Sequence, residues 1–214
     1  LNNVMGAKFD RILSPMAGHV LVPDQAALLM QKYMGAETLF HELSHSLGPG
    51  VITKNGVETT VSAELQELYS ATEEGKADVM GAYNILFMME KGELPVSEKE
   101  NFLATYFVGL FRAVRFGAHE AHGRGAVFQY NYFKNAGAAE WDEAAGRYRI
   151  DFAKLETAIR GLVHDIVVLQ GDGDYAAAKA FLDENAELDE HADRVIASMM
   201  DIPVDIQPVY PDEL

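Results

Sequence analysis

The stretch SAELQELYSATEEGKADVMGAYNILFMMEK, residues 62–91, decides the fold of this chain. From Leu65 to Leu86, apolar side chains recur along it at the spacing of one helix face. Ser62 is a residue type that caps helix N-termini, and Gly92 follows the last turn. The stretch therefore predicts one long helix.

Further helical patterns lie on both sides of this stretch. They cover residues 24–35, 36–47, 97–116, 119–134, 152–171, 175–185 and 187–200. Residues 1–23 contain Pro15, Gly18 and Pro23, so we expect an irregular N-terminal arm there, and the tail over 203–211 should be extended.

Two short segments favour β-hairpins instead. In residues 51–61, β-branched residues flank Asn55-Gly56, a common hairpin turn, and residues 141–151 alternate around Gly146. The predicted fold class is thus mainly α, a single helical lobe over residues 1–214 with one or two small β-hairpins.

The composition restricts the chemistry. A net charge of −16 disfavours nucleic acid and anionic membrane surfaces as partners, and no apolar run reaches the roughly 18 to 20 residues of a membrane span. Because there are no cysteines, only His, Asp and Glu side chains remain as metal ligands. We expect a cytoplasmic protein, and because the chain begins with Leu1 rather than Met we expect a fragment of a longer one.

His41-Glu42-Leu43-Ser44-His45 is an H-E-x-x-H sequence within the helical run over 36–47. Spacing of i, i+4 puts both imidazoles on one helix face, where two nitrogens can meet one zinc ion. Glu42 is rotated away from that pair and can take a proton from a water in the open coordination position of the metal. Two imidazoles and a carboxylate suit Zn²⁺, although manganese and cobalt stay open.

A third ligand is expected from Glu73-Glu74-Gly75-Lys76-Ala77-Asp78. Glu74 and Asp78 share a helix face, so Glu74 could bind zinc while Asp78 accepts a hydrogen bond from a ligating histidine. Glu73 points elsewhere, toward a supporting role or a substrate amine. Taken alone, these acids would instead read as a solvated helix face. The remaining histidines without a readable partner pattern are interpreted as structural or surface residues: His19, His164 and His191.

These motifs resemble the dipeptidyl peptidase III family of zinc peptidases, in which a histidine–glutamate helix motif is followed by E-E-x-x-A-[E/D]. The resemblance implies that Glu74 is the third zinc ligand and that Glu73 and Asp78 are supporting acids. It also matches Ala121-His122 to a family Ala-His pair whose histidine stabilises the reacting carbonyl. The alternative is that His122 merely lines a helix start together with His119.

The resemblance runs over residues 36–136 and is nearer to divergent bacterial and plant relatives, some of which are joined to a Nudix domain. It implies that this chain is only the zinc-binding lobe and that an N-terminal lobe of the same chain is missing. Two departures are visible. Two residues rather than three separate Glu42 from His45, and Ala126 stands where the family has Arg, with Arg124 nearby.

The predicted function is zinc-dependent hydrolysis of a peptide or small amide, with Glu42 and His122 as catalytic residues and His41, His45 and Glu74 as ligands. One alternative is a metal-stabilised binding or regulatory module without turnover. Another keeps the chemistry but changes the substrate to a non-peptide ester or amide. Intact Glu42 favours catalysis, because metal retention alone would not require a carboxylate there.

Overall fold

The computed structural model describes residues 2–209, and helices dominate this part of the chain. The α-helices are α1 (Asn2–Lys8), α2 (Ser14–Val20), α3 (Pro23–Ala26), α4 (Gln31–Ser44), α5 (Val61–Leu65), α6 (Tyr69–Glu90), α7 (Lys99–Val114), α8 (Ala121–Asn135), α9 (Phe152–Asp172), α10 (Tyr175–Glu184) and α11 (Glu190–Ala197). The strands are β1 (Val51–Lys54), β2 (Val57–Thr60), β3 (Ala139–Asp142) and β4 (Arg147–Ile150). The predicted mainly α class with small hairpins is confirmed. None of the helices within 2–209 combines the length and apolar character that crossing a membrane requires.

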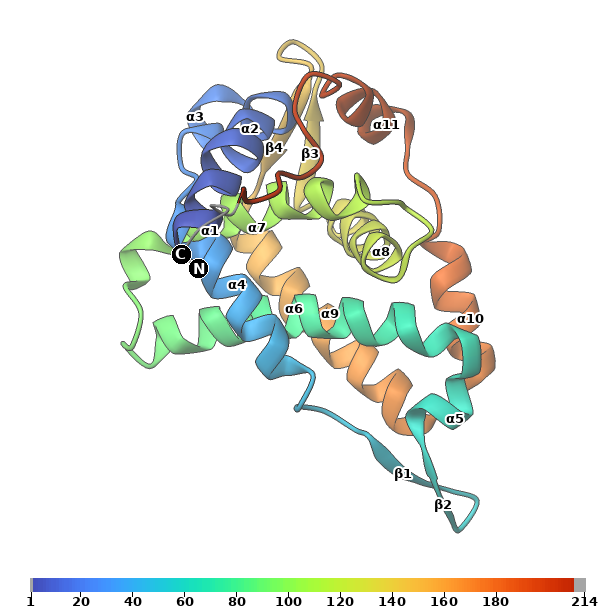
Figure 1. The fold of residues 1–214 in the computed structure, drawn as a ribbon. Coiled ribbons are helices and arrows are strands. Elements are labelled where there is room, and N and C mark those ends of the chain that lie inside the picture. Colours follow the sequence, from blue (N-terminus) through green and yellow to red (C-terminus); the bar gives the residue numbers. More distant parts are fainter. Residues whose placement is uncertain (1, 210–214) are drawn as a thin grey trace.

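Helix α6 lies at the centre, with α4, α8 and α9 packed around it (Figure 1). Glycines allow this close packing. A Cβ on Gly81 of α6 would lie 3.0 Å from the backbone nitrogen of His41 and 3.2 Å from the carbonyl carbon of Phe40 in α4. A Cβ on Gly125 of α8 would lie 3.0 Å from the Cα of Gly75 in α6. The backbones of α4, α6 and α8 therefore meet where the predicted motifs lie.

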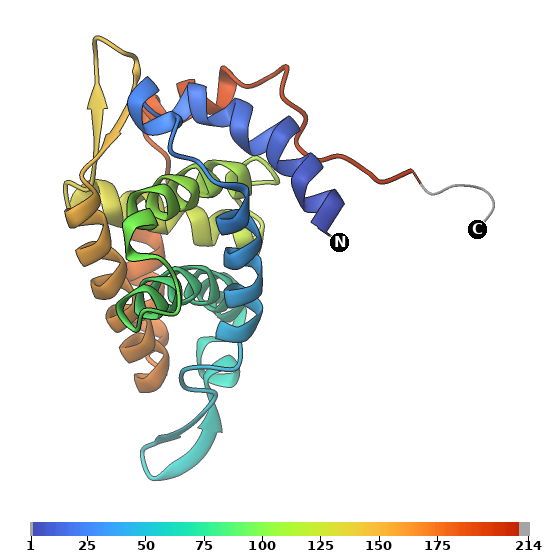
Figure 2. The same ribbon diagram turned by 90° about the vertical axis from the view of Figure 1, so that its left-hand side faces the viewer.

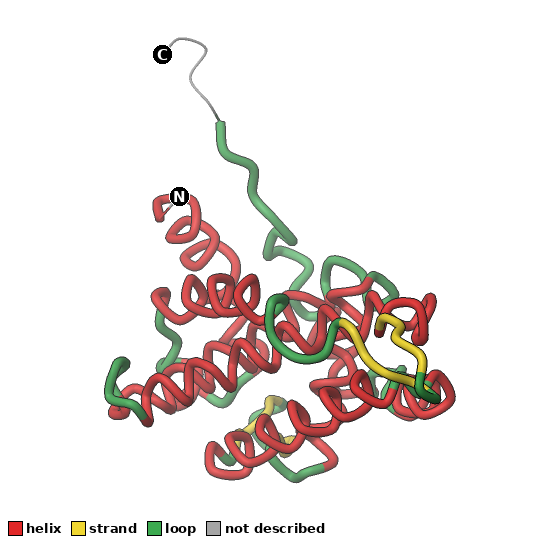
Figure 3. The backbone as a smooth tube through the Cα atoms, turned by 90° about the horizontal axis from the view of Figure 1, so that it is seen from below, coloured by secondary structure: helices red, strands yellow, loops and turns green. Residues whose placement is uncertain are grey.

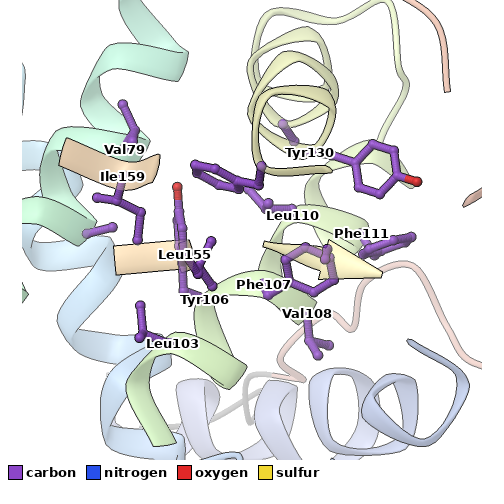
Figure 4. Packing of buried hydrophobic residues seen from close by; sticks show 14 of the residues in the cluster. Val79, Leu103, Tyr106, Phe107, Val108, Leu110, Phe111, Tyr130, Leu155 and Ile159 are labelled. Carbon is purple, nitrogen blue, oxygen red and sulfur yellow. The ribbon is translucent and has the colours of Figure 1, made fainter. Parts of the chain in front are cut away.

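Helix α7 supplies much of the hydrophobic core. It is buried on most of its surface, which is typical of a helix covered by other elements on several sides. Its aromatic side chains reach α8, where the ring of Phe111 lies 5.7 Å from that of Tyr130. Figure 4 shows these side chains together with Val79 of α6 and Leu155 and Ile159 of α9. One continuous core thus joins the helices that surround α6.

The two hairpins lie at opposite ends of the molecule (Figures 1 and 2). In the antiparallel pair β1–β2, Asn55 and Gly56 both have positive φ, at 53° and 78°, which the predicted tight hairpin turn requires. The antiparallel pair β3–β4 is joined to the N-terminal segment by a bridge between Leu21 and Tyr148. Figure 3 shows how small a part the strands form beside the helices.

The long helix predicted from Ser62 is interrupted. Thr60, not Ser62, is the N-cap of α5, since its hydroxyl accepts a hydrogen bond from the backbone N–H of Ala63. At Gln66 the backbone takes φ 52° and ψ −127°, a conformation that residues other than glycine rarely adopt. A 3-10 turn over Gln66–Leu68 then leads into α6. From Tyr69 onward the predicted helix is confirmed.

The expected irregular arm over residues 1–23 is wrong for the part described. Helices α1 and α2 are joined there by a π-helical turn, Phe9–Leu13. Pro15 lies in the first turn of α2, and Pro23 in the first turn of α3. The missing N–H of Pro23 costs nothing at its helix start. Before Pro15, Leu13 and Ser14 keep helical φ and ψ, so the chain stays helical across the π-helical turn.

Candidate metal centre

The two histidines of the first motif lie side by side at the C-terminal end of α4. His41 is in the last turn and His45 is the C-cap with helical φ and ψ, so the i, i+4 relationship holds to the end. Their rings lie 4.7 Å apart and nearly perpendicular, and their Nε2 atoms are 3.1 Å apart. Gly48, at φ 85°, then turns the chain away.

Glu74 reaches this pair from α6. Its Oε2 atom lies 3.4 Å from Nε2 of His41 and 3.6 Å from Nε2 of His45. These three side chains can each offer one atom to a common ion, since the atoms lie within 4.8 Å of one another. The structure therefore brings together the three residues predicted as ligands.

The other nitrogen of each imidazole is held by a carboxylate of α6. Nδ1 of His41 lies 2.7 Å from Oδ1 of Asp78, and Nδ1 of His45 lies 3.0 Å from Oε1 of Glu73. With Nδ1 of each imidazole turned to a carboxylate, the Nε2 atoms of both rings face the centre. Burial lowers the pKa of His41, but the hydrogen bond and charge of Asp78 outweigh it and the pKa is raised.

Glu73 has two further partners that the motifs did not reveal. Lys76 is almost completely buried, and its ammonium lies 2.9 Å from Oε1 of Glu73 and donates to the carbonyl of Leu47 at 2.7 Å. Gln170 of α9 donates to Oε2 of Glu73 at 3.1 Å. Burial raises the pKa of Glu73, yet the hydrogen bonds from Lys76 and His45 prevail and the pKa is lowered. Glu73 is thus held ionised.

Glu42 lies on the exposed side of α4 and lines a cavity of about 560 Å³. The same cavity is lined by His41, Asp78 and His122, so a molecule in it would meet Glu42 and the histidines together. Within residues 2–209, Glu42 is not among the candidate ligands His41, His45 and Glu74.

His122 lies in the first turn of α8, as both readings of the sequence expected, and it also faces the cluster. Its Nδ1 is 3.2 Å from Oε2 of Glu74, and its ring lies 5.6 Å from that of His41. The side chain is 60% exposed, so the imidazole remains reachable from the cavity. His119, by contrast, lies exposed in the turn before α8 and belongs to neither group of candidate ligands found within residues 2–209.

One carboxylate oxygen shows whether these ligand residues fit a zinc ion. Oε2 of Glu74 is buried and makes no hydrogen bond in the described structure, although three imidazole nitrogens lie 3.2 to 3.6 Å from it. Two Nε2 lone pairs and a carboxylate oxygen at one point repel one another unless a cation lies between them. Nitrogen and oxygen donors of this kind fit zinc.

A second grouping, His41 with Asp78 and His122, also brings three donors together. Using Nδ1 of His41 as a ligand would break its 2.7 Å hydrogen bond to Asp78. The set with Glu74 keeps that bond and is the better candidate.

The remaining histidines have local partners away from this cluster. His19 pairs with Ser198, His164 with Asp165, and His191 stacks on Trp141 with the ring centroids 4.3 Å apart. The structural interpretation of these three residues agrees with those contacts.

Comparison with known proteins extends the resemblance to nearly the whole chain. The structure of DPP III from Caldithrix abyssi matches with a TM-score of 0.95 at 42% identity, over 98% of this chain and 40% of that one. Dipeptidyl-peptidase III from Corallococcus sp. strain EGB matches with a TM-score of 0.92 at 33% identity, over 98% and 39%. The curated protein Nudix hydrolase 3 of Arabidopsis thaliana is 38% identical over 99% of this chain and 28% of its own length.

No family model matches the chain. The chain spans about two fifths of the length of the solved relatives and 28% of the curated one. The similarity includes α1, α2 and the helices after residue 136, well beyond the motifs that first suggested it. The predicted resemblance to the dipeptidyl peptidase III family is therefore confirmed, over the whole described chain and over a part of those longer enzymes.

Proposed function

We propose that this chain is the metal-binding part of a zinc-dependent hydrolase, a metallopeptidase that cleaves peptide bonds. The observation that carries the proposal is Oε2 of Glu74, a buried carboxylate oxygen without a hydrogen bond among three imidazole nitrogens. The relatives support the broader class, because their names are those of a peptidase and of a Nudix hydrolase, both hydrolases.

In this proposal His41, His45 and Glu74 hold the metal. Three protein ligands leave one coordination position for water or substrate, as in catalytic rather than structural zinc sites. A zinc ion held there would supply Lewis acidity toward a carbonyl oxygen and a water. Asp78 and Glu73 orient the imidazoles of His41 and His45 so that each Nε2 faces the metal.

Glu42 acts as the proton carrier. It lines the cavity next to His41 without being tied into the ligand cluster, so its carboxylate is placed to accept a proton from the attacking water and pass it to the leaving amine. His122 lies on the same cavity wall, where an imidazole N–H can donate to the oxygen on which negative charge develops.

The substrate that fits this proposal is a peptide or small amide. The net charge of −16 favours a neutral or cationic molecule over a polyanion. The two alternatives are a binding module without turnover and a zinc hydrolase of a non-peptide ester or amide. The place of Glu42 on the cavity wall favours turnover over binding alone.

Metal analysis and one glutamate substitution test the proposal. The purified protein should contain stoichiometric zinc, and His41→Ala should lose it. Glu42→Gln should keep zinc and lose hydrolysis of a library of dipeptide-releasing substrates. The matched control Glu58→Gln, at an exposed position on β2, should keep both.

Absence of zinc from both the wild type and His41→Ala would overturn the site. Retained zinc without turnover of any substrate would select the binding module. Turnover of esters or lactones but not of peptides would select the non-peptide hydrolase. Unaltered hydrolysis by Glu42→Gln would remove the proton-carrying role alone.

A further inference from the structure

Gln170 is a fully buried polar residue near the C-terminal end of α9. Buried positions along this helix are Leu155, Ile159, Leu162 and Ile166, and the next turn of the same stripe carries Gln170. The periodicity calls for an apolar side chain at this position. A carboxamide there needs another explanation.

Only half of that carboxamide is engaged. Nε2 of Gln170 donates to Oε2 of Glu73 at 3.1 Å, whereas Oε1 of Gln170 is enclosed without a hydrogen-bond partner in the described structure. The orientation of the amide follows from chemistry, since an ionised carboxylate can only accept. A buried carbonyl oxygen without a donor is destabilising, and an apolar side chain of the same shape would avoid that cost.

We propose that Gln170 is a positioning residue for the zinc centre, acting through Glu73 on His45. The inference rests on the proposed function. Oε1 of Glu73 accepts from Nδ1 of His45 at 3.0 Å and from Lys76 at 2.9 Å, and Gln170 holds the other oxygen. Because both oxygens are held, the Glu73 carboxylate is kept from rotating about its Cγ–Cδ bond. His45 then keeps its proton on Nδ1 and its Nε2 lone pair toward the metal.

This arrangement connects three helices to one imidazole. His45 comes from the end of α4, Glu73 and Lys76 from α6, and Gln170 from α9. The end of α9 is itself anchored to the first hairpin, because Lys54 of β1 donates to the carbonyl of Gly173. The position of the Gln170 carboxamide is therefore set by rigid elements rather than by a loop.

The shape-matched substitution Gln170→Met separates positioning from stability. We expect the zinc dissociation constant, measured by chelator competition, to rise about tenfold, as outer-sphere substitutions do. The thermal midpoint of the zinc-free protein should fall less than in the control below, because the loss of the donor to Glu73 is offset by removal of the unpaired oxygen.

Gln25→Met is the matched control. Gln25 is also buried, but both halves of its amide are engaged with the backbone of Ile150, at 2.8 Å each. This variant should lower the thermal midpoint and leave zinc affinity unchanged. An unchanged zinc affinity in Gln170→Met, or a loss of affinity accompanied by a midpoint drop like that of the control, would overturn the inference.

A readout without zinc distinguishes failure of this inference from failure of the proposed function. Imidazole ¹⁵N shifts of the zinc-free protein report which nitrogen of His45 carries the proton. We expect the proton of His45 on Nδ1 in the wild type and in Gln25→Met. In Gln170→Met we expect a larger fraction of molecules with that proton on Nε2. If the wild type binds no zinc, the proposed function fails while this comparison still decides the role of Gln170, and an unchanged His45 tautomer would overturn it.

Discussion

The two imidazoles of the centre are supported by carboxylates that stand in opposite electrical surroundings. Behind His45, Glu73 is paired with the ammonium of Lys76, a lysine that is only 2% exposed. Behind His41, Asp78 has a second carboxyl group nearby, that of Glu37, whose Oε1 is buried without a hydrogen bond in the described structure.

The pKa values follow this difference. That of Glu73 is lowered by its hydrogen bonds against the effect of burial, while the pKa of Glu37 is raised well above the usual range by burial and by the negative charge of Asp78. Burial and the neighbouring Asp78 therefore both favour the neutral form of Glu37. The carboxylate of Glu73 thus has a buried cation beside it, whereas that of Asp78 has the carboxyl group of Glu37, whose pKa it helps to raise. The hydrogen bond to the imidazole is the same in kind, but its dependence on charge and on pH differs.

The largest effect is expected from removing the buried cation. Lys76→Met leaves Glu73 ionised in a partly buried site and frees the carbonyl of Leu47, so the free energy of unfolding should fall by roughly 3 kcal/mol in urea titrations. Lys76→Arg, which keeps the positive charge, should lower the free energy of unfolding less than Lys76→Met does. The control Lys179→Met removes an exposed pair with Asp183 and should lower the free energy of unfolding far less, because solvent screens that pair. Equal costs for the two lysines would show that Glu73 does not depend on a buried charge.

A second comparison replaces the two carboxylates themselves. Glu73→Gln and Asp78→Asn should both weaken zinc binding by roughly 10- to 100-fold in chelator competition, since each removes an ionised acceptor from a ligating imidazole. Only Glu73→Gln also leaves a buried ammonium without its counter-charge, so it should lower the stability of the zinc-free protein more. Asp78→Asn should lower the pKa of Glu37, because one cause of its elevation is gone. A greater stability loss in Asp78→Asn would reverse the assignment.

Much of the fold and of the ligand set could be read from the sequence. Apolar spacing predicted most of the helices, but it divided α4 at Gly35, whereas the helix runs unbroken from Gln31 to Ser44. Asn55-Gly56 predicted the turn of the first hairpin. Helical periodicity placed His41 and His45 on one face, and Glu74 and Asp78 on another. The N-terminal arm was wrong because Pro23 begins a helix and Pro15 follows a π-helical turn without interrupting the helical backbone.

The supporting residues were out of reach for a physical reason. Lys76 stands inside the second motif, but its role depends on the end of α4 lying beside α6, which spacing along one helix does not express. Gln170 meets Glu73 across 97 positions of sequence, through the packing of α9 on α6. His122 was found through family resemblance alone. A usable signal was present only at Gln170, as a polar residue in an apolar stripe.

The smallest effect concerns the proton on Glu37. In the unfolded chain this carboxyl titrates near the ordinary value of about 4.3, and in the folded protein its pKa is higher. Above the unfolded pKa the folded state therefore binds more protons, so the contribution of Glu37 to stability falls as pH rises toward its folded pKa. Glu37→Gln removes this titration while keeping a neutral side chain of the same size. The free energy of unfolding of Glu37→Gln should match that of the wild type most closely near pH 4 and exceed it increasingly toward neutral pH. The exposed control Glu58→Gln should not show this increase. If the pH profiles of Glu37→Gln and the wild type ran parallel, the pKa of Glu37 would be the same in the folded and unfolded states, and the effect of burial and of Asp78 on it would be wrong.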